Sequence, residues 1–344
     1  MRTFNIAVLG ATGAVGRELI DILRERKFPI KSLKALASAR SAGRAIEAGG
    51  ETLIIEEATP ESFDDVDIAF FTAGGAISQR FAPEARSRGV VVIDNTSAFR
   101  MDPEVPLVVP EVNGEDLLEH DGLIANPNCS TTIAVMALAP LHRAAGIKRA
   151  VVSTYQAVSG IGAAAIDDLQ RQVKQYVEGK PITATTYPSP SAAKQYQMLF
   201  NLIPHIDAFD EADYTKEEWK MVRETQKILH DDSLKITATT VRVPVFRSHS
   251  ESINVELHKE LSAARAREVL ENAPGVRVYD NPEKQEYPMP LLTTDDDLVW
   301  VGRIRQDLSV PWGLNLWVVG DQIRKGAALN SVQIAEELVA RQLV

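Results

Sequence analysis

Short apolar runs recur along the first third of this chain, and small, polar or glycine residues follow each of them. The runs cover residues 5–9, 33–37, 67–71 and 90–94. Brief, nearly uninterrupted runs of this kind are typical of strands buried on both faces of a parallel sheet. Residues 17–23 carry apolar side chains at helical spacing between the first two runs. The alternation of strand and helix predicts a Rossmann-type α/β domain.

The second half of the chain has longer β-branched runs. Residues 151–155 and 235–245 predict strands, and Pro244 indicates that the latter run is an edge strand or ends there. Residues 163–177 predict a helix, whereas residues 180–215 are rich in Pro, Ser, Thr and Tyr and predict irregular structure. A chain of 344 residues is long enough for two domains, each with its own core.

Two local patterns refine this second half. Thr215 precedes an acidic first turn, which predicts a capped helix that begins there. Ile253, Val255 and Leu257 alternate as in a strand, so we expect His249 in the loop leading to it and His258 exposed at its end.

The net charge of −10 argues against partners that are nucleic acids or anionic membrane surfaces. No run approaches the length of a membrane span, and glycines at 10, 13 and 16 interrupt the apolar start that loosely resembles a signal peptide. We therefore expect a cytoplasmic enzyme with an intact N-terminus. The single cysteine excludes an intrachain disulfide, and the six histidines form no metal-binding spacing, so no metal site is expected.

A glycine-rich turn follows the first predicted strand and opens the first predicted helix. It contains Gly10, Gly13 and Gly16, and strand, glycine turn and helix together are the context that a phosphate-binding loop requires. The spacing is GxxGxxG rather than GxGxxG, and a tight turn needs glycine for steric reasons alone. We interpret the turn as part of a dinucleotide site.

The second predicted strand ends in Ser38, Ala39 and Arg40, with no acidic residue there to bind a ribose hydroxyl. Serine and arginine suit a 2′-phosphate, which indicates NADP rather than NAD. The alternative is that Arg40 lies in a solvated loop. Thr72 and Arg100 follow the next two strands, at the sheet edge where open α/β domains bind ligands. Arg100 could instead form a surface salt bridge with Asp102 or Glu104.

Cys129 lies in the segment Asn126–Thr132, which contains an Asn-Pro turn and then Ser and Thr residues of the capping type ahead of an apolar stretch. A thiol at a helix N-terminus faces unpaired N–H groups and the positive end of the helix dipole, and both favour the thiolate. We interpret Cys129 as a nucleophile. The alternative is a buried small hydrophobic residue, which most free cysteines are.

Further candidates occur in the second half. Glu217 and Lys220 share a helix face, either as site residues or as a stabilising surface pair. Arg242 and His249 could line a cleft, and a second glycine loop at Ser159 and Gly160 could contact a cofactor.

Taken together, these motifs resemble the aspartate-β-semialdehyde dehydrogenase family along essentially the whole chain. The motifs are GATGAVG at 10–16, SAFRMD at 97–102, VPLVVPEVN at 105–113, NPNCSTT at 126–132, TYQAVSG at 154–160, EEWK at 217–220, RVPV at 242–245, HSE at 249–251 and RKGAALN at 324–330. One departure is Ile161, where the family's SGAG has alanine.

The resemblance implies a glyceraldehyde-3-phosphate-dehydrogenase-like arrangement. An NADP-binding domain would comprise residues 1–127 completed by a helix in 328–344, and an α+β catalytic and dimerisation domain with a mixed sheet would comprise residues 128–327. It also implies a homodimer, with a tetramer as the alternative.

The resemblance further assigns roles. Cys129 is the acyl-accepting nucleophile, His249 the general acid/base, and Gln156 a group that orients the substrate. Arg242 pairs the substrate carboxylate, Glu217 lies near its ammonium group, and Arg100, Asn128 and Lys220 hold the phosphoryl group. The implied cofactor-binding residues are Gly10, Thr12, Gly13, Ala14, Val15, Ser38, Ala39, Arg40, Thr72, Ser159, Gly160 and Gln322.

The implied reaction is the NADPH-dependent conversion of aspartyl 4-phosphate to aspartate 4-semialdehyde through a cysteine thioester, in the biosynthesis of lysine or diaminopimelate, threonine, methionine and isoleucine. Two alternatives are a reductase of another acyl phosphate, such as N-acetylglutamyl phosphate, and an inactive NADP-binding paralogue. Glu217 favours a substrate with a free amine, and retention of Cys129, Gln156 and His249 together argues against the paralogue.

Overall fold

The polypeptide crosses twice between two structural units. The computed structural model describes residues 2–344. The first unit contains Met1–Cys129 and Gly326–Val344, and the second contains Ser130–Lys325. The crossings therefore fall between Cys129 and Ser130 and between Lys325 and Gly326. The boundaries expected from the sequence, after residues 127 and 327, lie two residues from these positions.

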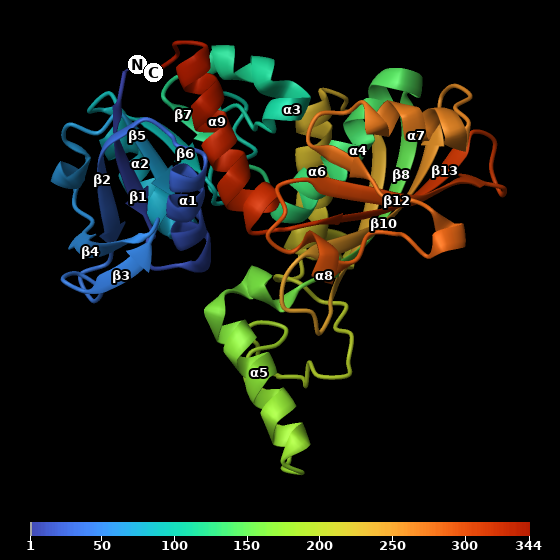
Figure 1. The fold of residues 1–344 in the computed structure, drawn as a ribbon, viewed down its shortest axis with the longest axis horizontal. Helices are drawn as coiled ribbons and strands as arrows, with labels where there is room; N and C mark the ends of the chain where they lie inside the picture. The colour runs from blue at the N-terminus through green and yellow to red at the C-terminus, as the bar shows by residue number, and fades with distance from the viewer. Residues whose placement is uncertain (1) are drawn as a thin grey trace. The chain divides into compact units, whose positions relative to one another are not determined.

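A seven-stranded sheet forms the centre of the first unit, in the order β3-β4-β2-β1-β5-β6-β7 (Figure 1). All neighbouring strands run parallel except β3 and β4, which form an antiparallel pair. Strands β5 and β6 are buried throughout, and β1 is buried except at Asn5, because their runs of Ile, Val, Leu, Phe and Ala are apolar on both faces. The strands are β1 Phe4–Leu9, β2 Ile30–Ala37, β3 Ala45–Ala48, β4 Glu51–Glu57, β5 Ile68–Phe71, β6 Val91–Asp94 and β7 Leu123–Ala125.

The last helix of the chain packs on the first helix within this unit (Figure 1). Asn330 on the last helix donates from Nδ2 to the Val108 carbonyl at 2.9 Å and to the Asn126 side chain at 2.7 Å. The C-terminal helix is thereby bonded to the segment that leads into Cys129. The helices of this unit are α1 Ala14–Glu25, η1 Pro60–Phe63, α2 Gly75–Arg86, α3 Pro110–Asn113, η2 Gly114–Glu119 and α9 Leu329–Ala340.

The second unit is built on a mixed six-stranded sheet in the order β11-β12-β13-β10-β8-β9. The β8–β9 and β11–β12 pairs are parallel and the other pairs are antiparallel. The mixed sheet, together with the doubly wound sheet of the first unit, confirms the predicted fold class. The strands are β8 Ile147–Gln156, β9 Lys235–Arg242, β10 His249–Leu257, β11 Val276–Val278, β12 Val299–Asp307 and β13 Gly313–Gly320.

Two expectations for this unit need correction. His249 is the first residue of β10 rather than a loop residue. Ser130, Thr131 and Thr132 lie inside the helix that begins at Cys129, whereas the sequence placed them ahead of it as capping residues. The loop before this helix comprises Asn126, Pro127 and Asn128, and Asn128 directly precedes the first helical residue.

Helices α6, α7 and α8 contact this sheet at different strands. The helix that begins after Thr215 packs on β9, and Thr215 caps it as expected, forming a capping box with Glu218. Thr131 contacts the Met221 sulfur at 3.7 Å, so α4 and α6 also meet. The helices of this unit are α4 Cys129–Ala145, η3 Val158–Ile161, α5 Ala163–Val177, η4 Glu211–Asp213, α6 Lys216–Leu229, α7 Ala263–Glu271, η5 Pro282–Lys284, α8 Pro290–Thr293 and the π-helix η6 Arg324–Ala328.

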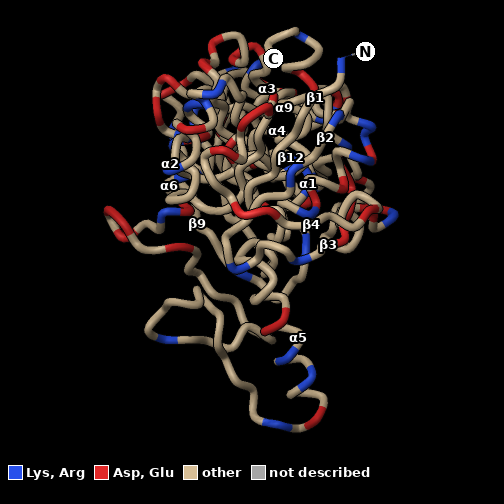
Figure 2. The backbone as a smooth tube through the Cα atoms, turned by 90° about the vertical axis from the view of Figure 1, so that its left-hand side faces the viewer, with Lys and Arg blue, Asp and Glu red and all other residues tan. Residues whose placement is uncertain are grey.

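Charged residues of both signs are interspersed along the backbone, as the neighbouring blue and red segments around α1, β3 and β4 show (Figure 2). Among residues 2–344, no helix combines the length and the apolar character that crossing a membrane requires.

Candidate functional site

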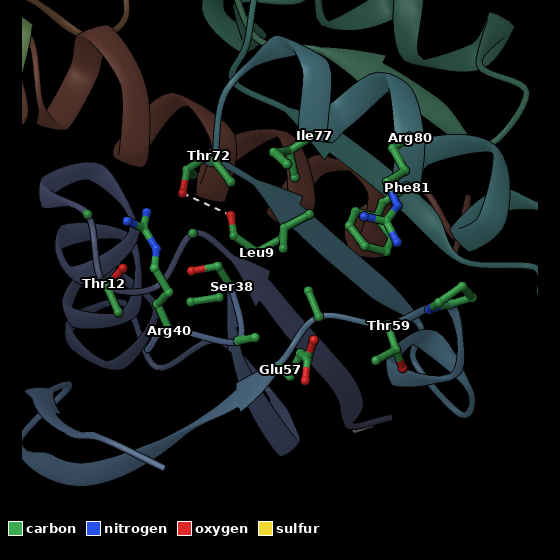
Figure 3. Close-up of a pocket in the computed structure, with 17 residues that line it drawn as sticks. Leu9, Thr12, Ser38, Arg40, Glu57, Thr59, Thr72, Ile77, Arg80 and Phe81 are labelled. Atoms are coloured by element: carbon green, nitrogen blue, oxygen red, sulfur yellow. Dashed lines mark hydrogen bonds between the residues drawn. The ribbon is translucent and has the colours of Figure 1, made fainter. Parts of the chain in front are cut away.

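A cavity of about 650 Å³ opens at the carboxyl ends of the first-unit strands (Figure 3). Its lining comes from the ends of β1, β2, β4 and β5, from the segments that follow them and from α2. The carboxyl edge of an open α/β sheet is where such domains bind nucleotides, and the volume suits a cofactor. The lining residues are Leu9, Gly10, Thr12, Gly13, Ala37, Ser38, Ala39, Arg40, Glu57, Ala58, Thr59, Pro60, Thr72, Ala73, Ile77, Arg80 and Phe81.

The cavity brings together most of the expected cofactor residues. Gly10, Thr12, Gly13, Ser38, Ala39, Arg40 and Thr72 all line it. Ala14 and Val15 are the first two residues of α1, directly after Gly13, and lie outside the lining. The Thr72 hydroxyl donates to the Leu9 carbonyl at 3.0 Å, which fixes the ends of β1 and β5 against each other.

Three lining residues with polar or charged side chains were missed in the sequence. Glu57 ends β4, the neighbour of β2, and pairs in register with Ala37. Arg80 lies at the far end of the cavity from Arg40, beside Phe81, and Thr59 lies below it (Figure 3). After the antiparallel β3–β4 hairpin, β4 pairs with β2. The alternation of strands and helices in the sequence does not predict that β4 and β2 are neighbours. A carboxylate therefore does face the cofactor cavity, although from β4 and not from β2.

Arg100 is buried in the first unit and bound by main-chain carbonyls. Its Nε donates to the Asn126 carbonyl at 2.9 Å and its Nη2 to the Asn95 carbonyl at 2.8 Å. These two bonds fix the guanidinium beside the loop that carries Asn128 and Cys129. Arg100 is only 7% exposed, so it is not the exposed surface residue that one alternative allowed.

Cys129 is the first residue of α4 and is partly exposed, whereas Asn128 before it and Ser130 after it are buried. The first N–H groups of a helix have no intrahelical acceptor and point along the axis, a geometry that favours an anion. Because Cys129 is partly exposed, it does not fit the alternative of a buried small hydrophobic residue. A reagent or substrate can therefore reach the thiol.

Gly326 packs against Cys129. A Cβ built on Gly326 would lie 2.9 Å from the Cys129 Cβ, closer than real Cβ contacts occur, and 3.2 Å from its Cα. Gly326 belongs to a short π-helix, Arg324–Ala328, and such turns are found disproportionately at functional sites. Only glycine fits here without displacing the start of α4.

His249 is fully buried in the second unit, and a backbone group sets its tautomer. The Ala157 N–H donates to His249 Nδ1 at 3.1 Å, so a neutral ring carries its proton on Nε2. Nε2 has no hydrogen-bond partner among the residues that the structure describes. Burial, reinforced by the charge of Arg242, lowers the pKa of His249 to about 3. The ring is therefore a neutral hydrogen-bond donor near neutral pH.

Gln156 and Arg242 end the neighbouring strands β8 and β9 and pair in register. Arg242 is buried and donates from Nη1 to the Ala157 carbonyl at 2.6 Å. A Cβ on Gly160 would lie 3.0 Å from Arg242 Nη1 and 3.6 Å from His249 Nε2. Because glycine has no Cβ, no side chain at position 160 crowds these two nitrogen atoms. The sheet thus places His249, Gln156 and Arg242 side by side at one end.

An acidic and a basic residue of α6 adjoin this row. Gln156 Nε2 donates to Glu217 Oε1 at 3.3 Å, and Lys220 Nζ donates to Glu217 Oε2 at 3.0 Å and to Asp207 Oδ2 at 2.8 Å. Burial by itself lowers the pKa of Lys220, but Glu217 and Asp207 outweigh it and hold that pKa above its usual range. Glu217 is buried, so the pair is not an exposed surface pair. Asp207, in the irregular region, was missed in the sequence.

Ser159 and Gln322 also meet in the second unit. Gln322 Nε2 donates to Ser159 Oγ at 2.5 Å, and its Oε1 accepts from the Ser248 N–H at 2.8 Å. The loop at Ser159 and the start of β10 are thereby connected next to His249.

The structure distributes the expected residues over both units. Arg100, Asn128, Cys129 and the cavity residues belong to the first, and Gln156, Ser159, Gly160, Glu217, Lys220, Arg242, His249 and Gln322 belong to the second. Among residues 2–344, no cluster of three or more His, Cys, Asp or Glu side chains is arranged to hold a metal ion.

Two family models match the chain. Residues 5–120 match the semialdehyde dehydrogenase NAD binding domain, and residues 138–325 match the semialdehyde dehydrogenase dimerisation domain. The first match covers the unit that contains the cavity, which is therefore a nicotinamide-dinucleotide-binding domain.

Full-length relatives agree with this match. The chain is 54% identical to aspartate-semialdehyde dehydrogenase of Aquifex aeolicus over 99% of both chains, and 49% identical to that of Bacillus subtilis over 100% of this chain and 99% of the relative. Among solved structures, it superposes with a TM-score of 0.93 on aspartate semialdehyde dehydrogenase II of Vibrio cholerae complexed with ASA, at 45% identity and 99% coverage of both. The enzyme of Candida albicans with NADP gives a TM-score of 0.78 at 25% identity, covering 99% of this chain and 100% of that chain.

Proposed function

The chain belongs to the aspartate-semialdehyde dehydrogenase family, and from this premise we propose that it reduces L-aspartyl 4-phosphate to L-aspartate 4-semialdehyde with NADPH and releases phosphate. The observation that carries the proposal is a group of polar side chains at one end of the second-unit sheet, in which Gln156, Glu217, Arg242 and His249 are buried and Lys220 is partly buried. A structural core gains nothing from burying so many polar side chains together, whereas recognition of a small charged substrate needs them.

Three charges on the substrate match charges on these side chains. Arg242 binds the α-carboxylate, since a guanidinium offers a planar fork for carboxylate oxygens. Glu217 accepts from the α-ammonium group. Lys220, together with Arg100 and Asn128, binds the phosphoryl group. N-acetylglutamyl phosphate has no free amine to pair with Glu217, so the buried carboxylate favours the aspartyl substrate.

Cys129 supplies the covalent step. Its thiolate attacks the acyl carbon, the carbon–phosphate oxygen bond breaks, and a thioester and phosphate result. NADPH, when bound, supplies the hydride that reduces the thioester. His249 holds a proton at Nε2, where it donates a hydrogen bond to the oxygen of the resulting hemithioacetal and shuttles the proton as this adduct collapses to aldehyde and thiolate.

The first-unit cavity fits the cofactor. The N-terminus of α1 and the Gly10–Gly13 turn suit the pyrophosphate, and Ser38 with Arg40 suits a 2′-phosphate. The Candida albicans relative was solved with NADP, which supports NADP for this chain as well. Ser159, Gly160 and Gln322 are proposed to contact the nicotinamide half.

The match of residues 138–325 to a dimerisation domain supports a homodimer. A tetramer is the alternative, and sedimentation at working concentration distinguishes the two states. The proposed division of labour assigns residues 1–127 with the C-terminal helix to the cofactor and residues 128–327 to catalysis and dimerisation.

The test is the reverse reaction, phosphate-dependent reduction of NADP⁺ with L-aspartate 4-semialdehyde. We expect reduction that requires phosphate and that is far slower with N-acetylglutamate semialdehyde. Reduction that is independent of phosphate, or faster with the acetylated substrate, would refute the proposed activity.

A further inference from the structure

Arg100, the arginine proposed to bind phosphate, is oriented by two main-chain carbonyls from different loops. Its Nε donates to the Asn126 carbonyl at 2.9 Å, and its Nη2 donates to the Asn95 carbonyl at 2.8 Å. Nε and Nη2 form one edge of the planar guanidinium, so these two carbonyls determine the plane of the group and the direction of its third nitrogen. Whatever holds Asn95 and Asn126 in place therefore decides where Arg100 points.

Both asparagines follow the ends of neighbouring strands. Asn95 comes directly after β6, and Asn126 comes directly after β7. The N–H of Asn95 donates to the Phe71 carbonyl at 2.9 Å, and the N–H of Asn126 donates to the Asp94 carbonyl at 2.8 Å. The sheet therefore fixes the N–H side of each residue, and the side chain offers a second point of attachment.

Two consecutive residues of α9 bind these two side chains. Asn330 Nδ2 donates to Asn126 Oδ1 at 2.7 Å, and Ser331 Oγ donates to Asn95 Oδ1 at 2.9 Å. Asn95 Nδ2 has no partner among residues 2–344, so the bond from Ser331 is what holds this carboxamide. Asn330 and Ser331 are each 0% exposed, and burying a polar side chain is unfavourable unless it is hydrogen-bonded. Both buried side chains are bonded to the asparagines that orient Arg100.

Contacts elsewhere along α9 anchor the helix. Arg26 binds Glu336 through two hydrogen bonds of 2.8 Å, and Arg341 binds Glu115 at 3.0 Å. The apolar side chains of α9 in the first-unit core are Leu329, Val332, Ile334, Ala335 and Leu338. The helix can therefore serve as a fixed support for the two asparagines.

We propose that Asn330 and Ser331 are positioning residues that orient Arg100 towards phosphate through Asn126 and Asn95. The proposal rests on the proposed function, in which Arg100 binds the phosphoryl group. Neither α9 residue lines the cofactor cavity. Loss of either side chain should therefore weaken the binding of phosphate and leave the binding of NADP⁺ and of the semialdehyde nearly unchanged.

The first test removes the Ser331–Asn95 bond from either end. Ser331→Ala deletes the donor, and Asn95→Ala deletes the acceptor while its main-chain carbonyl remains. For each variant we expect KM for phosphate about three- to tenfold above wild type, the factor for one lost hydrogen bond, and KM for the semialdehyde within about twofold. The double variant should match the single variants, because all three lack the same bond. Ser331→Thr keeps the hydroxyl and should stay within about twofold of wild type.

The second test addresses Asn330 and includes a control on the same helix. Asn330→Ala should also raise KM for phosphate more than KM for the semialdehyde. Gln333 Nε2 donates to Glu111 Oε1 at 2.9 Å, so its bond reaches α3 and neither asparagine. Gln333→Ala should therefore leave KM for phosphate unchanged. A wild-type KM for phosphate in Ser331→Ala, equal rises for phosphate and semialdehyde, an equal rise in Gln333→Ala, or additive effects in the double variant would each overturn the proposal.

Calorimetric titration of inorganic phosphate into the protein with NADP⁺ supplies a readout that does not depend on turnover. Kd for phosphate should rise in Ser331→Ala and Asn330→Ala and keep its wild-type value in Gln333→Ala. Unchanged Kd values in the first two variants, or no binding of phosphate by wild type, would contradict the role of α9. If Ser331→Ala fails to fold, Asn95→Ala decides. If wild type binds phosphate but does not turn over aspartate semialdehyde, the proposed function fails, and the Kd values still show separately whether α9 orients Arg100.

Discussion

The backbone N–H of Ala157 donates to Nδ1 of His249, and this single 3.1 Å bond decides which ring nitrogen carries the proton. Ala157 directly follows Gln156 at the end of β8, and its carbonyl accepts from Arg242. One peptide segment therefore orients three side chains of the proposed site. Because the neutral ring is fully buried, protonation of His249 is coupled to folding.

The buried imidazole should make the protein sensitive to acid. The pKa of His249 is lowered to about 3, whereas the unfolded chain binds this proton near pH 6.5. The unfolded state therefore binds more protons in between, and stability falls as pH decreases from about 6.5 towards 3, by at most about 1.4 kcal/mol per pH unit. Urea unfolding at pH 7.5 and 5 should show a smaller pH effect in His249→Gln than in wild type. His258→Gln, which changes the exposed histidine just after the same strand, should behave like wild type.

Cys129→Ala should abolish turnover and leave NADP⁺ affinity nearly unchanged, because the thiol is the proposed nucleophile and does not line the cofactor cavity. Cys129→Ser should retain at most trace activity, since an alcohol is a weaker nucleophile near neutral pH. Steady-state kinetics and cofactor titration measure the two effects. More than a few per cent of the wild-type rate in the Ala variant would contradict a covalent mechanism.

Gly326→Ala should displace Cys129, because the new methyl group would collide with its Cβ. We expect slower alkylation of the thiol by iodoacetamide and a lower kcat, with NADP⁺ affinity retained. Gly114→Ala is the matched control in the same unit, since the nearest atom to a Cβ there is 3.7 Å away. Equal alkylation rates in Gly326→Ala and wild type would show that the contact does not position the nucleophile.

Arg40→Glu should shift preference from NADPH towards NADH, because a 2′-phosphate would then face a second carboxylate in a cavity that already contains Glu57. Kd values for both cofactors give the ratio. Arg44→Glu, an exposed arginine outside the cavity lining, controls for the change in net charge. An equal loss of affinity for both cofactors would assign Arg40 to folding or to the adenine pocket.

Arg100→Leu and Arg242→Leu should separate the two anion sites. Arg100→Leu should raise KM for phosphate by the factor that corresponds to a loss of about 2–3 kcal/mol in binding free energy from charge-assisted hydrogen bonds. Arg242→Leu should instead raise KM for the semialdehyde. Melting curves of both variants show whether either loss reflects unfolding, and lysine variants at the same positions retain the charge. The same kinetic pattern towards both substrates would argue against separate phosphate and carboxylate sites.

Several features of this protein were determined by the sequence alone. The apolar runs gave the strands of the doubly wound sheet, because strands buried on both faces must be apolar along their whole length. Thr215 and Glu218 marked the start of α6, because a capping box is a local interaction between residues three apart. The position of Cys129 at a helix start was likewise readable from Pro127 and the apolar stretch that follows.

Other features depended on pairings between distant segments. Only the order of the sheet shows that Glu57 shares a cavity with Arg40, because β4 joins β2 after a hairpin. Only the register of β8, β9 and β10 places Glu251 beneath His249 and opposite Thr154, and Gly326 meets Cys129 across 197 positions of sequence. Burial, the tautomer of His249 and the raised pKa of Glu251 follow from these contacts. Local patterns cannot encode them, because the pKa of a side chain depends on which charges and donors tertiary folding brings near it.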